Sequence, residues 1–328
     1  TCALPICRLI RDVLIDKSKE GVEVRVIYDD VGSWTASNEF FNEMRDAGIE
    51  VRSFLKVRFP PFTSKVNYRN HRKIVVIDGC VGFIGGMNIA ERYVTGVSWG
   101  GWRDTHILVE GKAVYGLQTI FLLDWAFVDQ TLITDKKYFP PIDVEQECLM
   151  QVVSTNPVSR WKNVMQAMVQ AILLARKYIY IQTPYFLPTE PISNALQTAA
   201  LSGVDVRLML PEKSDSKLVY WGSRSYIDGM LQAGVKVYLY QKGFLHAKTI
   251  VSDDLFATIG TTNIDFRSFE HNFEVNSFIY NEELAEQLKD IFIEDQHGST
   301  QLFLKNWEQR PIGERMLESV VRLFSPLL

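Results

Sequence analysis

The feature that constrains this chain most is an internal repeat. Residues 71–89 read HRKIVVIDGCVGFIGGMNI and align without a gap on residues 246–264, which read HAKTIVSDDLFATIGTTNI. Upstream and in the same order, GVEVRVI at 21–27 matches GVDVRLM at 203–209. Because helix and strand patterns recur in one order, we expect two tandem copies of one α/β domain.

Each copy alternates helix and strand patterns, which predicts an α/β/α sandwich with a largely parallel core. The run IVVI at 74–77 is expected to be a core strand buried on both faces. The second copy also contains an amphipathic helix pattern, followed by the strand YIYIQTPYF at 178–186. The counterpart of that strand would precede Arg8, so the first domain is expected to be truncated at its N-terminus.

The domain limits that we predict follow from these matches. Residues 1–7, TCALPIC, fit no capping or strand pattern and are set aside as an artefact or a non-native leader. The first domain is predicted at 8–147 and the second at 148–328. No window approaches 18 consecutive apolar residues, so the sequence predicts no transmembrane helix within the chain. The four cysteines form no C-x-x-C pair, which indicates a reducing compartment.

The pattern H-x-K-x-x-x-x-D opens both copies of the repeat. Displacing an alcohol from a phosphodiester requires a nucleophile, a proton for the leaving alkoxide, and cations around the phosphoryl oxygens. Two imidazoles can meet the first two needs near neutral pH, and two lysines can meet the third. Neither histidine can act alone, so we expect the halves to face each other across one site; a strand edge with satisfied polar ends is the alternative. The predicted catalytic residues are His71, Lys73, Asp78, His246, Lys248 and Asp253.

Two asparagines are predicted to assist the lysines. Asn88 and Asn263 each follow their histidine by 17 residues, and we expect them to bind the non-bridging oxygens. This arrangement needs no metal ion and no cofactor. The acidic pairs at 29–30 and 253–254 lack partners at ligand spacing and are interpreted as turn residues. The formal charge of −4 argues against a dedicated nucleic-acid-binding protein, so no nucleic acid is expected as a partner.

The doubled motif resembles the signature of the phospholipase D superfamily. The longer blocks similar to one branch of it, the bacterial cardiolipin synthases, are GFIGGMNIAERY, GGWRDTHILVEGKAV, FLLDW, TPYF, LPEKSDS, GFLHAKTIVSDD, TTNIDFRSFEHNFEVN and RLFSPLL. The resemblance covers residues 8–328. It implies two domains related by pseudo-twofold symmetry, with the active site at their interface. Synthases of this type carry two N-terminal membrane helices, and we expect this sequence to be a fragment without them.

The resemblance also implies a carboxylate that orients each histidine, and the matching positions are Asp104 and Glu274. For Asp104 the alternative is a salt bridge with the adjacent Arg103, whereas an inward Glu274 on an alternating strand would be costly unless it is paired. On extended strands, Asp78 and Asp253 would lie about 16–17 Å from the lysines, so we interpret both as support for the motif.

Contacts to a lipid head group are predicted at Tyr185, Arg224 and Arg267, with a solvated helix face as an equal alternative for Arg224. The segment 53–69, SFLKVRFPPFTSKVNYR, mixes aromatic and basic side chains, which suits an anionic membrane interface. An ordinary long surface loop is the alternative for that segment.

The resemblance implies that the chain is a phosphatidyltransferase. His71 would attack the phosphate of one phosphatidylglycerol, His246 would protonate the departing glycerol, and a second phosphatidylglycerol would displace the histidine to give cardiolipin. The implied partners are phosphatidylglycerol and an anionic membrane surface, and the implied location is the bacterial inner membrane, with the catalytic domains outside the bilayer. Two alternatives stay open: a phospholipase D-type phosphodiesterase that hydrolyses phospholipid or nucleic acid, and a catalytically inert lipid-surface binding protein.

Overall fold

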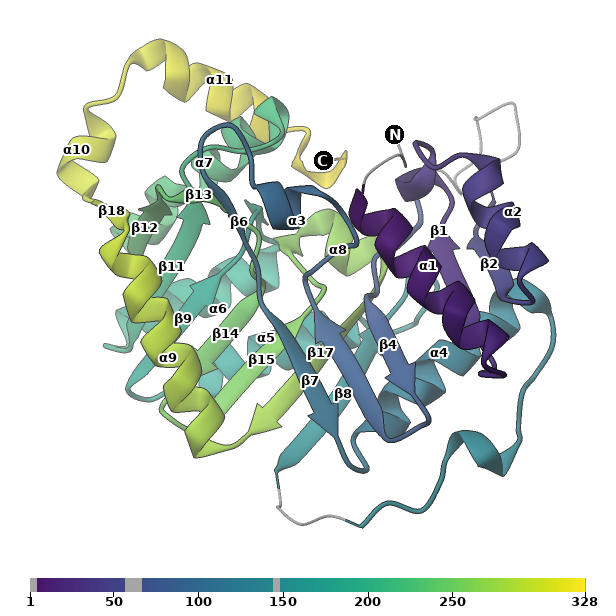
Figure 1. The fold of residues 1–328 in the computed structure, drawn as a ribbon. Coiled ribbons are helices and arrows are strands. Elements are labelled where there is room, and N and C mark those ends of the chain that lie inside the picture. The colour runs from purple at the N-terminus through teal and green to yellow at the C-terminus, as the bar shows by residue number, and fades with distance from the viewer. Residues whose placement is uncertain (1–4, 57–66, 144–147, 328) are drawn as a thin grey trace.

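One large mixed sheet runs through the second half of the chain and reaches into the first (Figure 1). The structure, a computed structural model, describes residues 5–56, 67–143 and 148–327. In spatial order, the strands of the large sheet are β18 (Ser299–Leu302), β12 (Lys236–Tyr240), β11 (Asp205–Pro211), β9 (Tyr178–Gln182), β14 (Thr249–Ser252), β15 (Phe256–Gly260), β17 (Asn272–Tyr280) and β3 (Arg69–Asn70). A further strand, β8 (Leu149–Thr155), also pairs with β17.

The expectation of a largely parallel core is wrong. β9, β11 and β12 run parallel, but β14, which follows the second histidine, is antiparallel to both of its neighbours, β9 and β15. The pairing with β15 follows from the short turn between β14 and β15, in which Asp253 and Asp254 adopt φ of 56° and 58°. Aspartate is one of the few residues that tolerate this left-handed conformation, so the acidic pair forms a hairpin and reverses the chain.

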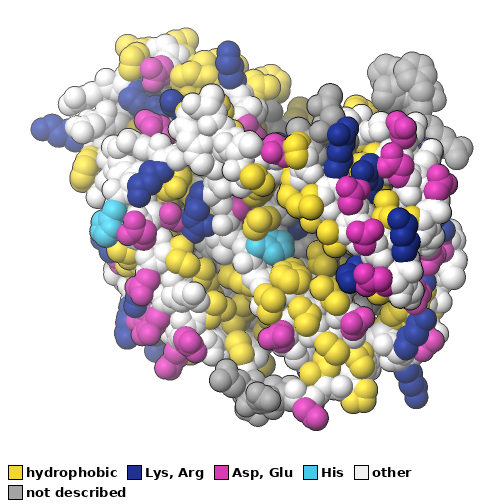
Figure 2. All heavy atoms as spheres, in the orientation of Figure 1, with side chains coloured by type: hydrophobic (Ala, Val, Ile, Leu, Met, Phe, Trp, Pro, Cys, Tyr) yellow, Lys and Arg dark blue, Asp and Glu magenta, His cyan; other side chains and the backbone are white. Residues whose placement is uncertain are grey.

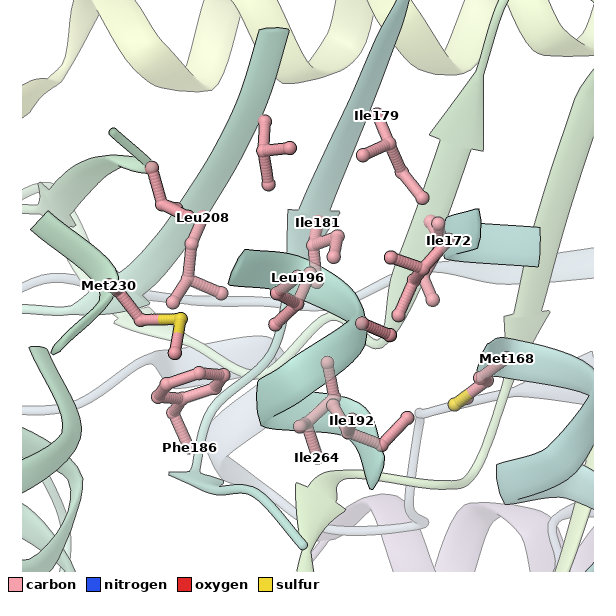
Figure 3. Packing of buried hydrophobic residues seen from close by; sticks show 14 of the residues in the cluster. Met168, Ile172, Ile179, Ile181, Phe186, Ile192, Leu196, Leu208, Met230 and Ile264 are labelled. Atoms are coloured by element: carbon pink, nitrogen blue, oxygen red, sulfur yellow. The ribbon is translucent and has the colours of Figure 1, made fainter. Parts of the chain in front are cut away.

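Helices cover both faces of the large sheet. On one face lie α5 (Asn163–Leu174), α6 (Glu190–Leu201) and α7 (Lys217–Gln232), and on the other lies α9 (Glu282–His297). Alternation along β9 serves both layers, because Ile179 and Ile181 pack under α5 and α6 while Tyr178 and Tyr180 pack toward α9. Figure 3 shows Ile179 and Ile181 among side chains from α5 and α6. The expected three-layer sandwich is therefore present in this half.

The first half contains two smaller sheets. One pairs β1 (Arg25–Asp29) with β2 (Glu50–Phe54) in parallel, and the other joins β4 (Ile74–Ile77), β5 (Val81–Gly85) and β7 (His106–Glu110) in antiparallel order. The helices of this half are α1 (Pro5–Lys19), α2 (Asn38–Asp46), α3 (Arg92–Thr95) and α4 (Val114–Asp129).

The prediction that IVVI is buried on both faces is wrong. Ile74 and Val76 pack in the cluster formed with α4, but Val75 and Ile77 are 50% and 49% exposed. At the equivalent position of the second half, Ile250 is buried in the cluster that contains α5 and α6. Within the described residues of the first half, no helix buries the corresponding face of β4, so its apolar side chains meet solvent.

The two halves are joined by two short parallel strand pairs that are equivalent under exchange of the halves. β3 pairs with the start of β17, with Asn70 opposite Phe273. β6 (Gly101–Arg103) pairs with β13 (Gly243–Leu245), with Arg103 opposite Leu245. This second pair requires glycine, because a Cβ on Gly243 (φ 143°) would lie 2.0 Å from the carbonyl oxygen of Gly101. The exchange is the relation that pseudo-twofold symmetry predicts.

Short elements complete the chain. They are β10 (Phe186–Leu187), β16 (Ile264–Asp265), α8 (Phe266–Glu270), α10 (Leu304–Glu308), α11 (Ile312–Arg322) and the 3-10 turns η1 (Val31–Ser33), η3 (Lys136–Tyr138) and η4 (Ser325–Leu327). Of the helices in the described ranges, none has the length and apolar character needed to cross a bilayer. Residues 57–66, most of the segment predicted to contact a membrane, lie outside the described residues.

Candidate active site

Each histidine of the repeat is held by a carboxylate from the other half of the chain. Nδ1 of His71 lies 2.9 Å from Oε1 of Glu274, which belongs to β17. Nδ1 of His246 lies 2.6 Å from Oδ2 of Asp104, which follows β6. The sequence predicted both carboxylates, and the structure adds that the pairs are exchanged. Each imidazole therefore depends on the opposite half for its orientation.

The strand pairs between the halves produce this exchange. The backbone N–H of His71 donates to the carbonyl of Phe273 at 3.0 Å, one residue before Glu274. Equivalently, the N–H of His246 donates to the carbonyl of Arg103 at 2.6 Å, one residue before Asp104. Each histidine thus stands beside its carboxylate because the strands before both residues are paired.

Glu274 is fully buried, and its carboxylate forms hydrogen bonds with three side chains, one of which is His71. Thr261 Oγ1 donates to Oε2, and Asn272 Nδ2 donates to Oε1 at 3.0 Å. Burial alone would raise the pKa of Glu274, but the charges of His71 and Lys73 and the hydrogen bond from His71 outweigh it and lower the pKa. The group is therefore an anion that can stabilise an imidazolium at His71.

Asp104 is surrounded in the same way, with a tyrosine in addition. Burial opposes ionisation, but Lys248 and His246 lower the pKa of Asp104 overall. The hydroxyl of Tyr93, on α3, donates to Oδ2 of Asp104 at 2.9 Å and lies 3.1 Å from Nδ1 of His246. The alignment of the halves could not have revealed this tyrosine, because the matching position in the second copy is Ser268.

The two lysines of the motifs lie beside their own histidines. Nζ of Lys73 donates to the carbonyl oxygen of His71 at 2.6 Å, and Nζ of Lys248 donates to the carbonyl oxygen of His246. Burial lowers the pKa of Lys73 to about 7 and that of Lys248 to about 8, although nearby carboxylates oppose the shift. Because these pKa values lie near neutral pH, an added negative charge would increase the protonation of both lysines.

The two histidines differ in their surroundings. The side chain of His71 is 27% exposed, whereas that of His246 is 7% exposed. Burial, reinforced by the charge of Lys248, lowers the pKa of His246 to about 3 in spite of Asp104. His246 is therefore a neutral imidazole near pH 7, and His71 is the histidine more open to a ligand.

The aspartates of the motifs lie at the far ends of their strands. Asp253 accepts backbone N–H groups from Arg176, Lys177 and Tyr178 at 2.8–2.9 Å, which ties the hairpin turn to the start of β9. Asp78 is exposed in the equivalent turn with φ of 52°. Neither contacts a histidine in the described part of the chain, in line with their interpretation as motif support.

The two asparagines follow β5 and β15, beside the site. Asn88 Nδ2 lies 3.5 Å from the hydroxyl of Tyr93. Asn263 is buried and donates from Nδ2 to Asp265 at 3.1 Å, while its Oδ1 has no hydrogen-bond partner among the described residues. Asn88 thus lies near His246 through Tyr93, and among the described residues neither asparagine forms a hydrogen bond with a lysine of the motif.

The predicted head-group residues are spread more widely. Tyr185 lies near the site, since its ring is 6.3 Å from that of Phe244, which is 5.9 Å from the ring of His246. Arg224 instead forms an ion pair with Glu318 at 3.3 Å. Arg267 is partly buried on α8. A separate feature of the surface is a cavity of about 430 Å³, which is lined by Trp99, Glu212, Lys213, Ser214, Lys217 and Tyr220.

Comparison with known proteins places the chain in a family. A family model described as "Cardiolipin synthase, PLD-like domain" matches residues 3–121 and 168–296. The chain is 46% identical over 322 residues to the major cardiolipin synthase ClsA of Bacillus subtilis (strain 168), covering 97% of this chain and 67% of that protein. The chain belongs to the cardiolipin synthase family of phospholipase D-like proteins. The family resemblance read from the doubled motif is thereby confirmed.

A second relative agrees with the first. The cardiolipin synthase of Geobacillus kaustophilus (strain HTA426) is 46% identical, again over 97% of this chain, which covers 64% of that protein. The chain thus spans about two thirds of the length of these relatives. The phosphatidylserine synthase structure from Haemophilus influenzae Rd KW20 superposes with a TM-score of 0.71 at 14% identity, over 98% of this chain and 87% of that one. The predicted fold of two tandem phospholipase D-like domains is confirmed.

Proposed function

We propose that this member of the cardiolipin synthase family transfers a phosphatidyl group from one phosphatidylglycerol to another, giving cardiolipin and glycerol. The observation that carries the proposal is the pair of exchanged dyads, His71 with Glu274 and His246 with Asp104, at 2.9 Å and 2.6 Å. Two oriented imidazoles in one site supply a nucleophile and a separate proton donor, which a phosphodiester exchange requires.

In the first step His71 is the nucleophile. Nδ1 of His71 faces Glu274, so Nε2 is the nitrogen that attacks phosphorus. A P–N bond forms, the bond from phosphorus to the glycerol oxygen breaks, and His246 gives a proton to that oxygen. In the second step the hydroxyl of another phosphatidylglycerol gives its proton to His246 and attacks phosphorus. The P–N bond breaks, and both histidines return to their initial state.

A bound phosphate would offset the effects that lower the pKa of His246. Lys248 and Lys73 both lower that pKa through repulsion, and burial lowers it further. A phosphodiester anion between the lysines cancels part of their charge and stabilises the imidazolium, so it raises the pKa of His246. We therefore expect substrate binding to convert His246 into the acid that the first step needs.

The donor, the location and the domain limits belong to the same proposal. Names of the relatives match cardiolipin as the product, and phosphatidylglycerol supplies both the phosphatidyl group and the accepting hydroxyl. Such lipids are presented at an anionic bilayer surface, so we place the site at the face of the bacterial inner membrane, outside the bilayer. The domain limits 8–147 and 148–328 stay predictions, as do the roles of the site residues. Residues 5–7 of the leader that was set aside belong to α1.

Two alternatives differ in what leaves the site. In a hydrolase, water would displace His71 and release phosphatidic acid, and the same dyads would serve. A catalytically inert lipid-binding protein has no need of two oriented histidines, and the paired carboxylates count against it.

Product analysis tests the proposal. Incubated with phosphatidylglycerol in detergent-dispersed form, the protein should yield cardiolipin and glycerol in equal amounts, measured by mass spectrometry and an enzymatic glycerol assay. Phosphatidic acid as the only lipid product would assign hydrolysis instead, and the absence of any product would favour the binding protein.

A further inference from the structure

The helix α11, near the end of the chain, differs from an ordinary surface helix, because it buries a charged side chain and exposes a row of apolar ones. The face turned toward the protein carries Glu318 and Val321, at 4% and 5% exposed. The outward face carries apolar side chains spaced by four, four and three residues, so they share one side of the helix. These residues, which we call the α11 stripe, are Ile312, Met316, Val320 and Leu323, at 54–79% exposed.

The stripe continues past the helix. Phe324 and Leu327 are 53% and 76% exposed in the segment that follows. Figure 2 shows hydrophobic side chains gathered at the upper left of the molecule, over α11. A helix that folds only against its own protein buries its apolar side, and α11 buries a carboxylate instead. The outward face is therefore suited to an apolar environment.

Buried contacts hold the helix in this orientation. Glu318 accepts hydrogen bonds from Arg310 and from Nε of Arg224, the latter at 3.3 Å. The guanidinium of Arg310 also lies 3.4 Å from the centre of the Trp307 ring. Rolling α11 to bury the stripe would leave two arginines and a carboxylate unpaired, which is strongly unfavourable in a buried position.

The position of α11 connects the stripe to the site. α11 packs along α7, and the turn after it contacts α8. The first turn of α7 supplies Lys217 and Tyr220 to the cavity of about 430 Å³, together with Trp99 of the first half. Figure 1 shows α11 and the C-terminus at the same end of the molecule as α3, which carries Tyr93.

We propose that the α11 stripe inserts into the head-group region of an anionic phospholipid bilayer and so holds the site at the lipid surface. The inference rests on the proposed function, because a diacyl lipid must reach His71 from a bilayer. The exposed cations Lys213 and Lys217 line the cavity and Arg315 lies on α11, and all three suit anionic head groups. An amphipathic helix with apolar and basic side chains on its outer side binds in this way.

Vesicle flotation of the 328-residue chain tests the proposal. The chain should float with phosphatidylglycerol vesicles, and Met316→Asp and Val320→Asp should each weaken binding about ten-fold or more, because a carboxylate resists insertion. Met316→Leu should bind like the unmodified chain. The matched control is Leu132→Asp, since Leu132 is 69% exposed after α4 and belongs to the other half. Circular dichroism checks that each variant is folded.

Three results would overturn the proposal. They are absence of vesicle binding by the unmodified chain, unchanged binding by both stripe variants, and equal losses in Leu132→Asp. A dimer in sedimentation equilibrium that Met316→Asp dissociates, without vesicle binding, would assign the stripe to a second copy of the chain. Turnover of short-chain phosphatidylglycerol dissolved as monomers by the unmodified chain reports the transferase proposal separately, so the two failures are distinguishable.

Discussion

At the scale of single residues, the exchange of carboxylates makes a direct prediction. Glu274→Gln and Asp104→Asn keep the size of each side chain but remove the charge that stabilises the imidazolium of His71 or His246. We expect kcat to fall roughly 10²–10⁴-fold, by analogy with loss of the orienting carboxylate in other dyads. Initial rates of cardiolipin formation measure the effect. Glu270→Gln, on α8, is the control and should keep its rate.

Tyr93 adds a second prediction at this scale. Its hydroxyl donates to Asp104 and lies 3.1 Å from Nδ1 of His246, so Tyr93→Phe removes one hydrogen bond to a charged group. Such a bond contributes about 1.5–3 kcal/mol, which corresponds to a loss in kcat of about ten-fold or more with little change in KM. The control is Tyr115→Phe, because the hydroxyl of Tyr115 donates to the carbonyl oxygen of Pro140 instead. Equal kinetics for both variants would remove Tyr93 from the site.

The sequence revealed which residues belong to the site better than it revealed how they are arranged. Repetition of His-x-Lys identified two histidines and two lysines, and the structure brings both sets beside buried carboxylates. The exchange between halves depends on β3 pairing with β17 and β6 with β13, and strands of two or three residues leave no periodic signal. Tyr93 escaped because it has no counterpart in the second copy.

At the scale of elements, the failed prediction for IVVI has a local cause. An apolar run predicts burial only if something covers each face, and coverage is a property of the whole fold. The direction of the strand was readable, however. Asp78-Gly79 stands between IVVI and VGFIG, and Asp-Gly between apolar runs is a strong signal for a hairpin. The hairpin of β4 and β5 is the result, and it excludes a parallel neighbour on that side.

The turns themselves give the prediction for this scale. Asp253 accepts three backbone N–H groups, whereas Asp78 in the equivalent turn is exposed. Both aspartates have φ near +55°, so an alanine is strained to the same extent at either position. This strain therefore cancels when the two variants are compared. We expect Asp253→Ala to lower the free energy of unfolding by about 1–3 kcal/mol more than Asp78→Ala.

Urea unfolding followed by circular dichroism measures this difference. The folded fraction of both variants should keep kcat, because neither aspartate touches a histidine within the described residues. A loss of kcat at full folding in Asp253→Ala would instead give that carboxylate a role in the chemistry.

At the scale of the whole molecule, the site behaves as one coupled set of charges drawn from both halves. Lys73 and Lys248, with pKa values of about 7 and about 8, are partly neutral at pH 8. A bound phosphodiester anion stabilises their protonated forms and raises both pKa values. Binding at pH 8 should therefore take up more than one proton per site from the two lysines, in addition to the proton that His246 gains, and binding at pH 6, where both lysines are already charged, should take up less from them.

Calorimetry with glycerophosphoglycerol, in buffers of different ionisation enthalpy, measures this uptake. Affinity should fall from pH 6 to pH 9, because the cationic forms of the lysines disappear over that range. Lys73→Met should reduce the uptake at pH 8, whereas Lys236→Met, which removes an exposed lysine paired with Asp205 on β11, should not. If the unmodified chain takes up no more protons at pH 8 than at pH 6, the lysines do not clamp the phosphate. With the expected uptake, His246 would stay neutral until the anionic substrate binds, and it would gain the proton that it gives to the leaving group only at that point.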